Sequence, residues 1–202
     1  MSVQTRPKSR QATSAATRRR KVSPWAWVGL AVPVVAIAVL VIVSTVKGEP
    51  GSALEAAQAP GFTLPTDAGG TASLSDILAD GDALLYFSMG VGCDGCFAQI
   101  PEVADALQER GLALVPIMVD DPRLVAQEAS RFGITMPILI DGTREVSEAY
   151  GMLGVYGHPD RPSHSFALVR ADGTVAWVKH YGTMFVTLDQ LLADMGSEAP
   201  GA

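Results

Sequence analysis

The sequence predicts an α/β domain, with a central mixed sheet flanked by helices, preceded by a single N-terminal transmembrane helix. Three observations support this prediction. Short apolar runs rich in strand-forming residues alternate with segments whose apolar residues recur at helical spacing. A stretch of 22 residues, Trp25 to Val46, contains no ionisable side chain. The charge also divides the chain, because residues 1–21 hold seven basic and no acidic groups (+7), whereas residues 51–202 hold 7 basic and 20 acidic groups (-13).

The composition limits the class of protein. A chain of 202 residues that is 48% hydrophobic can form one domain with a sizeable core plus an appendage. Its net charge of -6 argues against a nucleic-acid-binding protein, which normally presents a basic face. The two cysteines are too few for a disulfide-stapled small fold or a four-cysteine metal site.

The uncharged stretch is long enough to cross the hydrocarbon core, for which a helix needs about 20 residues. Trp25 and Trp27 lie at one end, where indoles favour the interface, and the basic run Arg18 to Lys21 before it indicates a cytoplasmic N-terminus. A cleaved signal peptide remains an alternative, although its apolar region is usually shorter. We expect a disordered basic tail (1–24), a transmembrane helix (25–46), a linker (47–60), an extracytoplasmic domain (61–196) and a flexible C-terminus (197–202).

The elements of the domain follow from its apolar patterns. Apolar runs predict strands at residues 83–88, 112–119 and 137–140, and helical spacing predicts helices at 97–108, 123–132 and 144–150. This alternation implies crossover connections between parallel strands. Two further runs, 165–169 and 175–179, flank Asp172-Gly173, a strong hairpin signal. A last helix is expected near 185–195, with Gly196 as its stop.

Both cysteines lie in one motif, Cys93-Asp94-Gly95-Cys96, directly after the first apolar strand and at the start of a helix. A thiolate at a helix N-terminus faces unsatisfied N–H groups and the positive end of the macrodipole, which lowers the pKa of the thiol. The spacing lets the second sulfur reach the first and resolve a mixed disulfide. We therefore expect Cys93 to be the attacking thiol and Cys96 the resolving thiol, with no cofactor other than their redox-active disulfide. An ionised Asp94 would oppose the Cys93 thiolate.

Three other interpretations of the motif stay open. A purely structural disulfide closing so short a loop would contribute only about 2 kcal/mol. A single reactive cysteine would reduce peroxides. A metal site, for copper above all, would recruit soft or imidazole ligands beside the cysteines. The candidate ligands for that site are Met89, Met118, Met136, His158, His164 and His180.

Several segments of the domain resemble the thioredoxin-like redoxins, particularly the membrane-anchored thiol–disulfide oxidoreductases of the TlpA/ResA kind, with the AhpC/TSA peroxiredoxins as near relatives. The resemblance covers about residues 59–195. Its motifs are the opening Pro60-Gly61-Phe62-Thr63-Leu64 with Ser73-Leu74-Ser75-Asp76, the Cys-x-x-Cys with Pro101 five residues on, Pro137 to Asp141 with Ala149-Tyr150-Gly151, and Phe166 to Val169 with Asp172-Gly173.

The resemblance implies a thioredoxin-like fold and disulfide exchange with protein thiols outside the cytosol. It also implies a membrane electron donor or acceptor, and the substrates it suggests include apocytochrome c. The chain departs from the family at several places. Gly92 replaces a tryptophan before the first cysteine, and Gln99 replaces a glutamate that tunes proton transfer. The family's cis-proline position falls on Ser163, one residue after Pro162, so Pro162 is either that proline, beside the cysteines, or an ordinary turn proline. His164 is then either close to the sulfurs or a hydrogen-bonded core histidine.

The peroxiredoxin relatives carry a threonine or serine three residues before the reactive cysteine, where its hydroxyl holds the peroxide. This chain has Gly90 at that position. The sequence therefore favours a dithiol exchange protein over a peroxidase.

Overall fold

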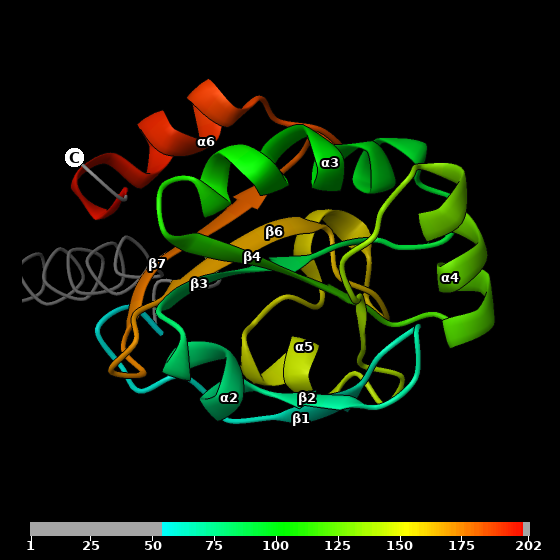
Figure 1. The fold of residues 1–202 in the computed structure, drawn as a ribbon, viewed down its shortest axis with the longest axis horizontal. Coiled ribbons are helices and arrows are strands. Elements are labelled where there is room, and N and C mark those ends of the chain that lie inside the picture. Colours follow the sequence, from blue (N-terminus) through cyan, green and yellow to red (C-terminus); the bar gives the residue numbers. More distant parts are fainter. Residues whose placement is uncertain (1–53, 200–202) are drawn as a thin grey trace, which may run out of the picture. The chain divides into compact units, whose positions relative to one another are not determined.

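The computed structural model describes residues 54–199 (Figure 1). Its elements are β1 (Thr63–Pro65), β2 (Thr71–Ser73), α2 (Leu74–Ala79), β3 (Asp82–Phe87), α3 (Asp94–Gln108), β4 (Leu112–Met118), α4 (Pro122–Arg131), β5 (Leu139–Ile140), α5 (Glu145–Ala149), the 3-10 turn η1 (Val155–Gly157), β6 (His164–Val169), β7 (Val175–Tyr181), α6 (Leu188–Met195) and the 3-10 turn η2 (Gly196–Glu198). The predicted tail and transmembrane helix lie outside the described residues. Among residues 54–199, no helix combines the length and apolar character needed to cross a membrane.

The predicted mixed sheet is confirmed, with five strands in the order β5-β4-β3-β6-β7. β3 pairs in parallel with β4, and β4 in parallel with β5, each across a helical connection. β6 pairs antiparallel with β3 and with β7. The β6–β7 turn is the predicted hairpin, closed by a hydrogen bond from Gly173 N–H to the carbonyl of Arg170 (2.8 Å).

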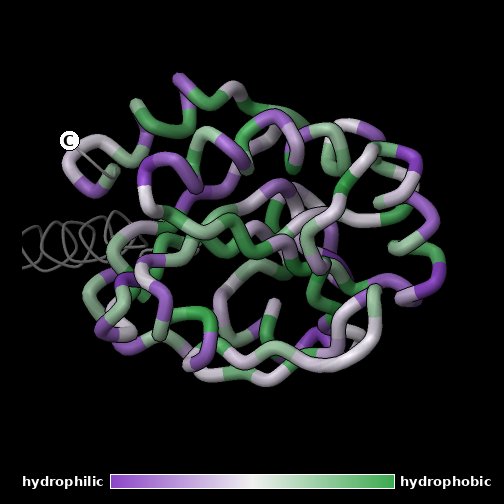
Figure 2. The backbone as a smooth tube through the Cα atoms, in the orientation of Figure 1, coloured by the Kyte–Doolittle hydropathy of each residue, from purple (hydrophilic) through white to green (hydrophobic). Residues whose placement is uncertain are grey.

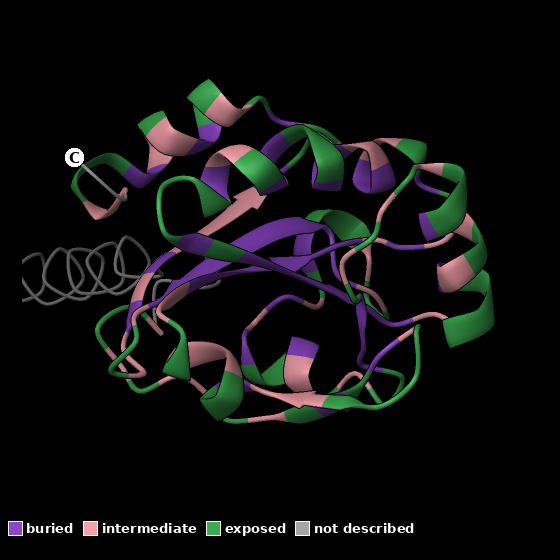
Figure 3. Ribbon diagram, in the orientation of Figure 1, coloured by how far each residue is buried: buried purple, intermediate pink, exposed green. Residues whose placement is uncertain are grey.

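Helices cover both faces of this sheet (Figure 1). One core joins alternate sheet residues to α3, α4 and α6, and includes Tyr86, Phe97, Phe166 and Leu191. The second core joins the opposite face to α2, α5 and the β1–β2 hairpin, and includes Leu85, Phe87 and Tyr150. The central strands are correspondingly buried and hydrophobic (Figures 2 and 3). Because β3 and β6 face helices on both sides, they read in the sequence as continuous apolar runs.

Side-chain caps define where the helices begin. Asp121 caps α4 by accepting from Arg123 N–H (2.9 Å), with Pro122 in the first turn. Thr187 caps α6 by accepting from Gln190 N–H (3.2 Å). The α6 helix ends at Gly196, as expected.

The structure differs from the sequence-based expectation at three places. Residues 74–79 form the short helix α2, capped by Ser73, where the sequence indicated only the end of an opening hairpin. Helix α3 begins at Asp94, three residues earlier than predicted, so Cys93 is its N-cap and Cys96 lies in its first turn. The segment before the domain is also ordered against it, because Ala56 N–H donates to Val175 O and Gln58 pairs with Thr174.

The C-terminal segment likewise packs against the sheet. Glu198 Oε2 accepts from Arg170 Nη2 at 2.6 Å, and Arg170 Nη1 also donates to Asp82 at 2.8 Å. These contacts attach η2 to the ends of β3 and β6, in a stretch that the sequence predicts to be flexible.

Candidate active site

The two cysteines form a disulfide at the N-terminus of α3, immediately after the loop that follows β3. Their Cα atoms are 5.3 Å apart. Cys93 is 6% exposed, whereas Cys96 has no exposed surface. Of the two residues, only Cys93 therefore presents surface to solvent or to a partner.

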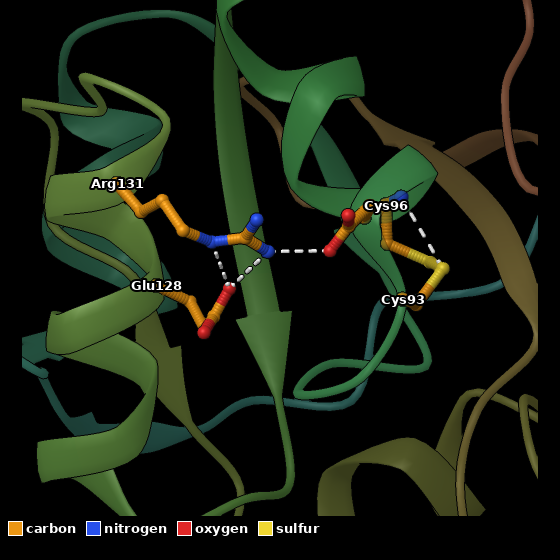
Figure 4. A network of polar contacts seen from close by, with 5 residues as sticks. Cys93, Cys96, Glu128 and Arg131 are labelled. Atoms are coloured by element: carbon orange, nitrogen blue, oxygen red, sulfur yellow. Dashed lines mark hydrogen bonds and ion pairs between the residues drawn. A yellow bond between two sulfur atoms is a disulfide. The ribbon is translucent and has the colours of Figure 1, made fainter.

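Cys93 is the N-cap residue of α3. Its Sγ accepts a hydrogen bond from Cys96 N–H at 3.3 Å, in the way that a serine or aspartate oxygen caps a helix (Figure 4). In the reduced protein the same N–H group and the helix dipole favour negative charge on this sulfur. The predicted attacking thiol thus occupies a position that stabilises its thiolate.

Asp94 is paired rather than free. Its Oδ1 accepts from Arg131 Nη2, and the same guanidinium bonds Glu128 at 2.6 Å (Figure 4). The two carboxylates raise the pKa of Arg131. Arg131 comes from α4, 37 residues away in sequence. Because this cation neutralises Asp94, the repulsion between Asp94 and the Cys93 thiolate is smaller than the sequence alone indicates, although both side chains are exposed.

Gly95 lies against the loop between β7 and α6. A Cβ atom at this position would stand 2.8 Å from the carbonyl oxygen of Met184 and 3.2 Å from its Cβ. Only a residue without a side chain allows this approach. Two exposed hydrophobic side chains, Phe185 (40%) and Tyr156 (59%), lie in or against the same loop, since the Tyr156 ring is 3.6 Å from a Cβ built on Gly182.

Pro101 lies within the helix, as the resemblance implies, whereas Pro162 is not the cis-proline that was one of its two alternatives. Pro101 lies inside α3 on its exposed side and deprives the Phe97 carbonyl of an intrahelical donor. No peptide bond in residues 54–199 is cis, so the bond before Pro162 is trans and Pro162 is not a cis-proline. The next residue, Ser163, is fully buried and lies 3.1 Å from the hydroxyl of Ser165.

His164 is a buried core histidine in a hydrogen-bonded chain. Val186 N–H donates to Gln99 Oε1 at 2.7 Å, which fixes the orientation of the Gln99 amide. The same oxygen lies 3.2 Å from His164 Nε2, so Nε2 carries the proton. Nδ1 then accepts from the Tyr86 hydroxyl at 2.9 Å, and that hydroxyl also lies 3.2 Å from the carbonyl of Cys96.

Burial explains the charge state of this chain. It lowers the pKa of His164 to about 4, and it raises the pKa of Tyr86 well above its usual value. At neutral pH both side chains are therefore uncharged. Gln99, at the position where the resemblance implies a glutamate, is part of this neutral polar network beneath the cysteines.

The loop before Cys93 is held by two charged side chains from elsewhere in the chain. Asp120 Oδ2 accepts from Val91 N–H at 2.9 Å. Arg161 donates to Asp120 Oδ1 at 3.2 Å and to the carbonyl of Met89 at 2.8 Å. Sequence reasoning missed Tyr86, Asp120 and Arg161. A tyrosine within an apolar strand and charged residues next to strand ends were the only signals available.

Several of the candidate metal ligands lie in separate surroundings. Within the described range, no group of three His, Cys, Asp or Glu side chains is arranged to hold an ion. Met118 is buried at the end of β4, His164 is bonded to Tyr86, and His180 Nδ1 lies 2.8 Å from the Ser165 hydroxyl.

Comparison with known proteins agrees with this geometry. The AhpC/TSA family model matches residues 56–178. A Mycobacterium tuberculosis (strain ATCC 25618 / H37Rv) protein named "Putative peroxiredoxin Rv2521" is 35% identical over 100 residues, 48% of this chain and 63% of that protein. The thiol-disulfide oxidoreductase ResA of Geobacillus thermodenitrificans (strain NG80-2) is 34% identical over 98 residues, 46% of this chain and 55% of ResA. The chain thus matches between half and two thirds of the length of these relatives.

The fold is found in solved structures as well. The crystal structure of peroxidoxin BcpB from Mycobacterium tuberculosis superposes with a TM-score of 0.60 at 24% identity, covering 71% of this chain and 96% of that one. The sequence match, the sheet order and the Cys93–Cys96 disulfide at a helix N-terminus agree with one another. The chain belongs to the AhpC/TSA family of thioredoxin-like redoxins, and it is similar to proteins named as thiol-disulfide oxidoreductases and putative peroxiredoxins.

Proposed function

We propose that this protein is a membrane-anchored, extracytoplasmic thiol–disulfide oxidoreductase that exchanges disulfides with protein substrates through Cys93 and Cys96. The observation that carries the proposal is the position of the pair. The partly exposed Cys93 caps α3 through Cys96 N–H, and the fully buried Cys96 lies one turn further on. The anchor and its orientation are supported by the uncharged stretch Trp25 to Val46 and the basic residues before it.

The exchange requires no cofactor. The Cys93 thiolate attacks one sulfur of a substrate disulfide, a new S–S bond forms, and the other substrate sulfur leaves as a thiolate and takes up a proton. The Cys96 thiolate then attacks Cys93 Sγ, the mixed disulfide breaks, and the substrate leaves as a second thiol. Two electrons pass from the pair to the substrate, and the protein ends with the Cys93–Cys96 disulfide. The same steps in reverse oxidise a substrate dithiol.

Because the chain contains only two cysteines, each cycle as a reductant needs an external dithiol donor, which we place in the membrane. Cysteine thiols of exported proteins, including apocytochrome c, are the substrates that suit this location. The stabilised N-cap thiolate and the neighbouring Asp94 act in opposite directions on the potential. We expect a midpoint nearer the thioredoxin value of about -270 mV than the strongly oxidising value of about -120 mV.

Trapping tests the proposal directly. In the full chain, Cys96→Ser should stall the mixed disulfide on Cys93, so that protein partners are recovered by non-reducing electrophoresis and released by dithiothreitol. Cys93→Ser is the matched control and should trap none. A membrane-impermeant maleimide added to intact cells should label Cys93 in the Cys96→Ser variant.

Three results would count against this function. Peroxide consumption in a fixed ratio to Cys93, without protein adducts, would indicate a peroxidase. Absence of adducts together with copper bound at a defined ratio would indicate a metal-binding module. Labelling of Cys93 only after cell lysis would contradict the extracytoplasmic location.

A further inference from the structure

The Asp120–Arg161 pair holds the loop from Met89 to Cys93 through hydrogen bonds to its backbone. Asp120 follows β4 and Arg161 precedes β6, and both are far from the loop in sequence. Arg161 Nη1 holds the Met89 carbonyl (2.8 Å), Asp120 Oδ2 holds Val91 N–H (2.9 Å), and Arg161 Nη2 lies 3.2 Å from Asp120 Oδ1. The pair is largely buried, with side-chain exposures of 30% for Arg161 and 13% for Asp120.

Gly90 lies between these two contacts. Its backbone is left-handed, with φ +78°, and a Cβ atom built on it would stand 1.9 Å from Asp120 Oδ2. Real Cβ contacts are essentially never below 3.0 Å. The Asp120 carboxylate thus fills the space into which any side chain at position 90 would extend. The loop then closes through Cys93 N–H, which donates to Gly90 O at 3.1 Å.

This arrangement bears on which oxidant the Cys93 thiolate accepts. Thiolate attack on a hydroperoxide forms a sulfenic acid and releases hydroxide or an alkoxide, a strongly basic leaving group that needs hydrogen-bond donors. Position 90 is where the peroxiredoxin resemblance implies a hydroxyl. In this chain the Asp120 carboxylate, whose oxygens accept hydrogen bonds from Val91 N–H and Arg161, fills that space. Attack on a disulfide releases a thiolate, a far weaker base.

We propose that Asp120 and Arg161 together position the Cys93 loop and make the site selective for disulfides over hydroperoxides. Asp120 is the specificity-determining residue, because its carboxylate excludes a side chain at Gly90 and fills that space with acceptor oxygens. Arg161 is a positioning residue, because it acts through Asp120 and the Met89 carbonyl. The inference rests on the proposed disulfide exchange and assigns the residues that restrict it.

The test uses the full chain in detergent, with Cys96→Ser so that only Cys93 reacts. Rate constants with the neutral disulfide 2,2′-dithiodipyridine and with hydrogen peroxide are measured across pH and compared at their alkaline plateaus. Comparing the rate constants at the plateau removes the effect of different thiolate fractions among the variants. The variants are Asp120→Asn, Arg161→Gln and the double variant. The matched control is the Asp82–Arg170 pair (2.8 Å, exposures 32% and 31%), at the opposite ends of β3 and β6.

Each single variant should lower the disulfide rate constant about threefold or more, and the double variant should lower it no further, because the two side chains act as a unit. Arg161→Lys, which keeps the charge but not both hydrogen bonds, should give an intermediate value. Asp120→Asn should raise the ratio of peroxide to disulfide rate constants about tenfold, because an amide donates hydrogen bonds. Asp82→Asn and Arg170→Gln should change neither rate.

Additive losses in the double variant would overturn the positioning role, and so would disulfide rates unchanged by all three variants. A peroxide-to-disulfide ratio that stays constant in Asp120→Asn would overturn the selectivity. If Asp120→Asn fails to fold, the Arg161→Gln and Arg161→Lys rates decide the positioning role. The selectivity is then decided by whether the parent protein consumes peroxide faster than a free thiol does. A folded parent protein that reacts with no disulfide would instead contradict the proposed function itself.

Discussion

The Tyr86 hydroxyl lies 2.9 Å from His164 Nδ1, and both side chains are fully buried between the sheet and the helix that carries the two cysteines. The pair joins β3 to β6 directly behind the redox centre. Through His164 Nε2 it continues to Gln99 Oε1 (3.2 Å), the residue that stands where the resemblance implies a glutamate.

His164 should make the stability depend on pH in a defined window. Burial lowers its pKa to about 4 in the folded protein, against about 6.5 when unfolded, so the unfolded chain binds the proton first. The free energy of unfolding should therefore be undiminished above pH 6.5 and fall by about 3 kcal/mol as the pH drops from 6.5 to 4. Denaturant titrations of the wild type and His164→Gln over this range measure the difference.

The matched control for that experiment is His158→Gln, in the half-buried segment after η1. It should keep the pH dependence of the wild type. Identical slopes for the wild type and His164→Gln would show that His164 is not held uncharged by burial.

Removing the Tyr86 hydroxyl should affect both stability and redox behaviour. In Tyr86→Phe, His164 Nδ1 loses its donor inside the core, which costs about 1–3 kcal/mol. The Cys96 carbonyl loses a neighbouring hydroxyl at 3.2 Å, so the midpoint potential should also shift. The control, Tyr150→Phe, loses a hydrogen bond to Pro60 O (3.0 Å) on the other face of the sheet and should leave the potential unchanged. Equal midpoint potentials for the wild type, Tyr86→Phe and Tyr150→Phe would show that the Tyr86 hydrogen bonds do not influence the cysteine pair.

A side chain at Gly95 should displace the loop that carries Met184. Gly95→Ala places a Cβ 2.8 Å from the Met184 carbonyl, so the loop must move and the free energy of unfolding should fall by about 1–3 kcal/mol. The rate of insulin disulfide reduction should fall as well, because the loop borders the cysteines. Gly142→Ala is the control, since nothing lies within 4 Å of its added Cβ and its φ is not positive. Wild-type activity in Gly95→Ala would show that the loop position is unimportant for exchange.

The Asp94–Arg131 ion pair should tune the redox potential and not the stability. Both side chains are exposed, so breaking the pair should hardly change the free energy of unfolding. Arg131→Gln leaves the Asp94 charge beside Cys93 uncompensated, disfavours the thiolate and should make the midpoint potential more negative. Asp94→Asn should shift it in the opposite direction. Glutathione redox buffers at low and high salt measure this, and the shifts should shrink as salt screens the charges. Shifts of the same sign in both variants would contradict the electrostatic explanation.

The fold could be predicted largely from local patterns. The apolar runs of β3 and β4 and the helical spacing of α3 and α4 are strong because both faces of the sheet are covered. Helix α2 escaped detection because six residues carry too little periodicity, and its cap at Ser73 has the same appearance as a turn. Composition predicts a linker at residues 47–60, but it does not report backbone hydrogen bonds such as that from Ala56 N–H to Val175 O, which attach the end of this segment to β7.

The cysteine pair, its place between a strand and a helix, and the division of charge along the chain can all be predicted from local sequence, because each depends on residues close together in the chain. The surroundings of Cys93 follow from tertiary packing. Arg131 contacts Asp94 across 37 residues of sequence. Asp120 contacts Val91 across 29 residues, and Arg161 contacts Met89 across 72. The trans bond before Pro162 and the burial of His164 are also consequences of packing. Charge neutralisation, loop position and burial depend on distances in space, and these exist only once the sheet has brought its strand ends together.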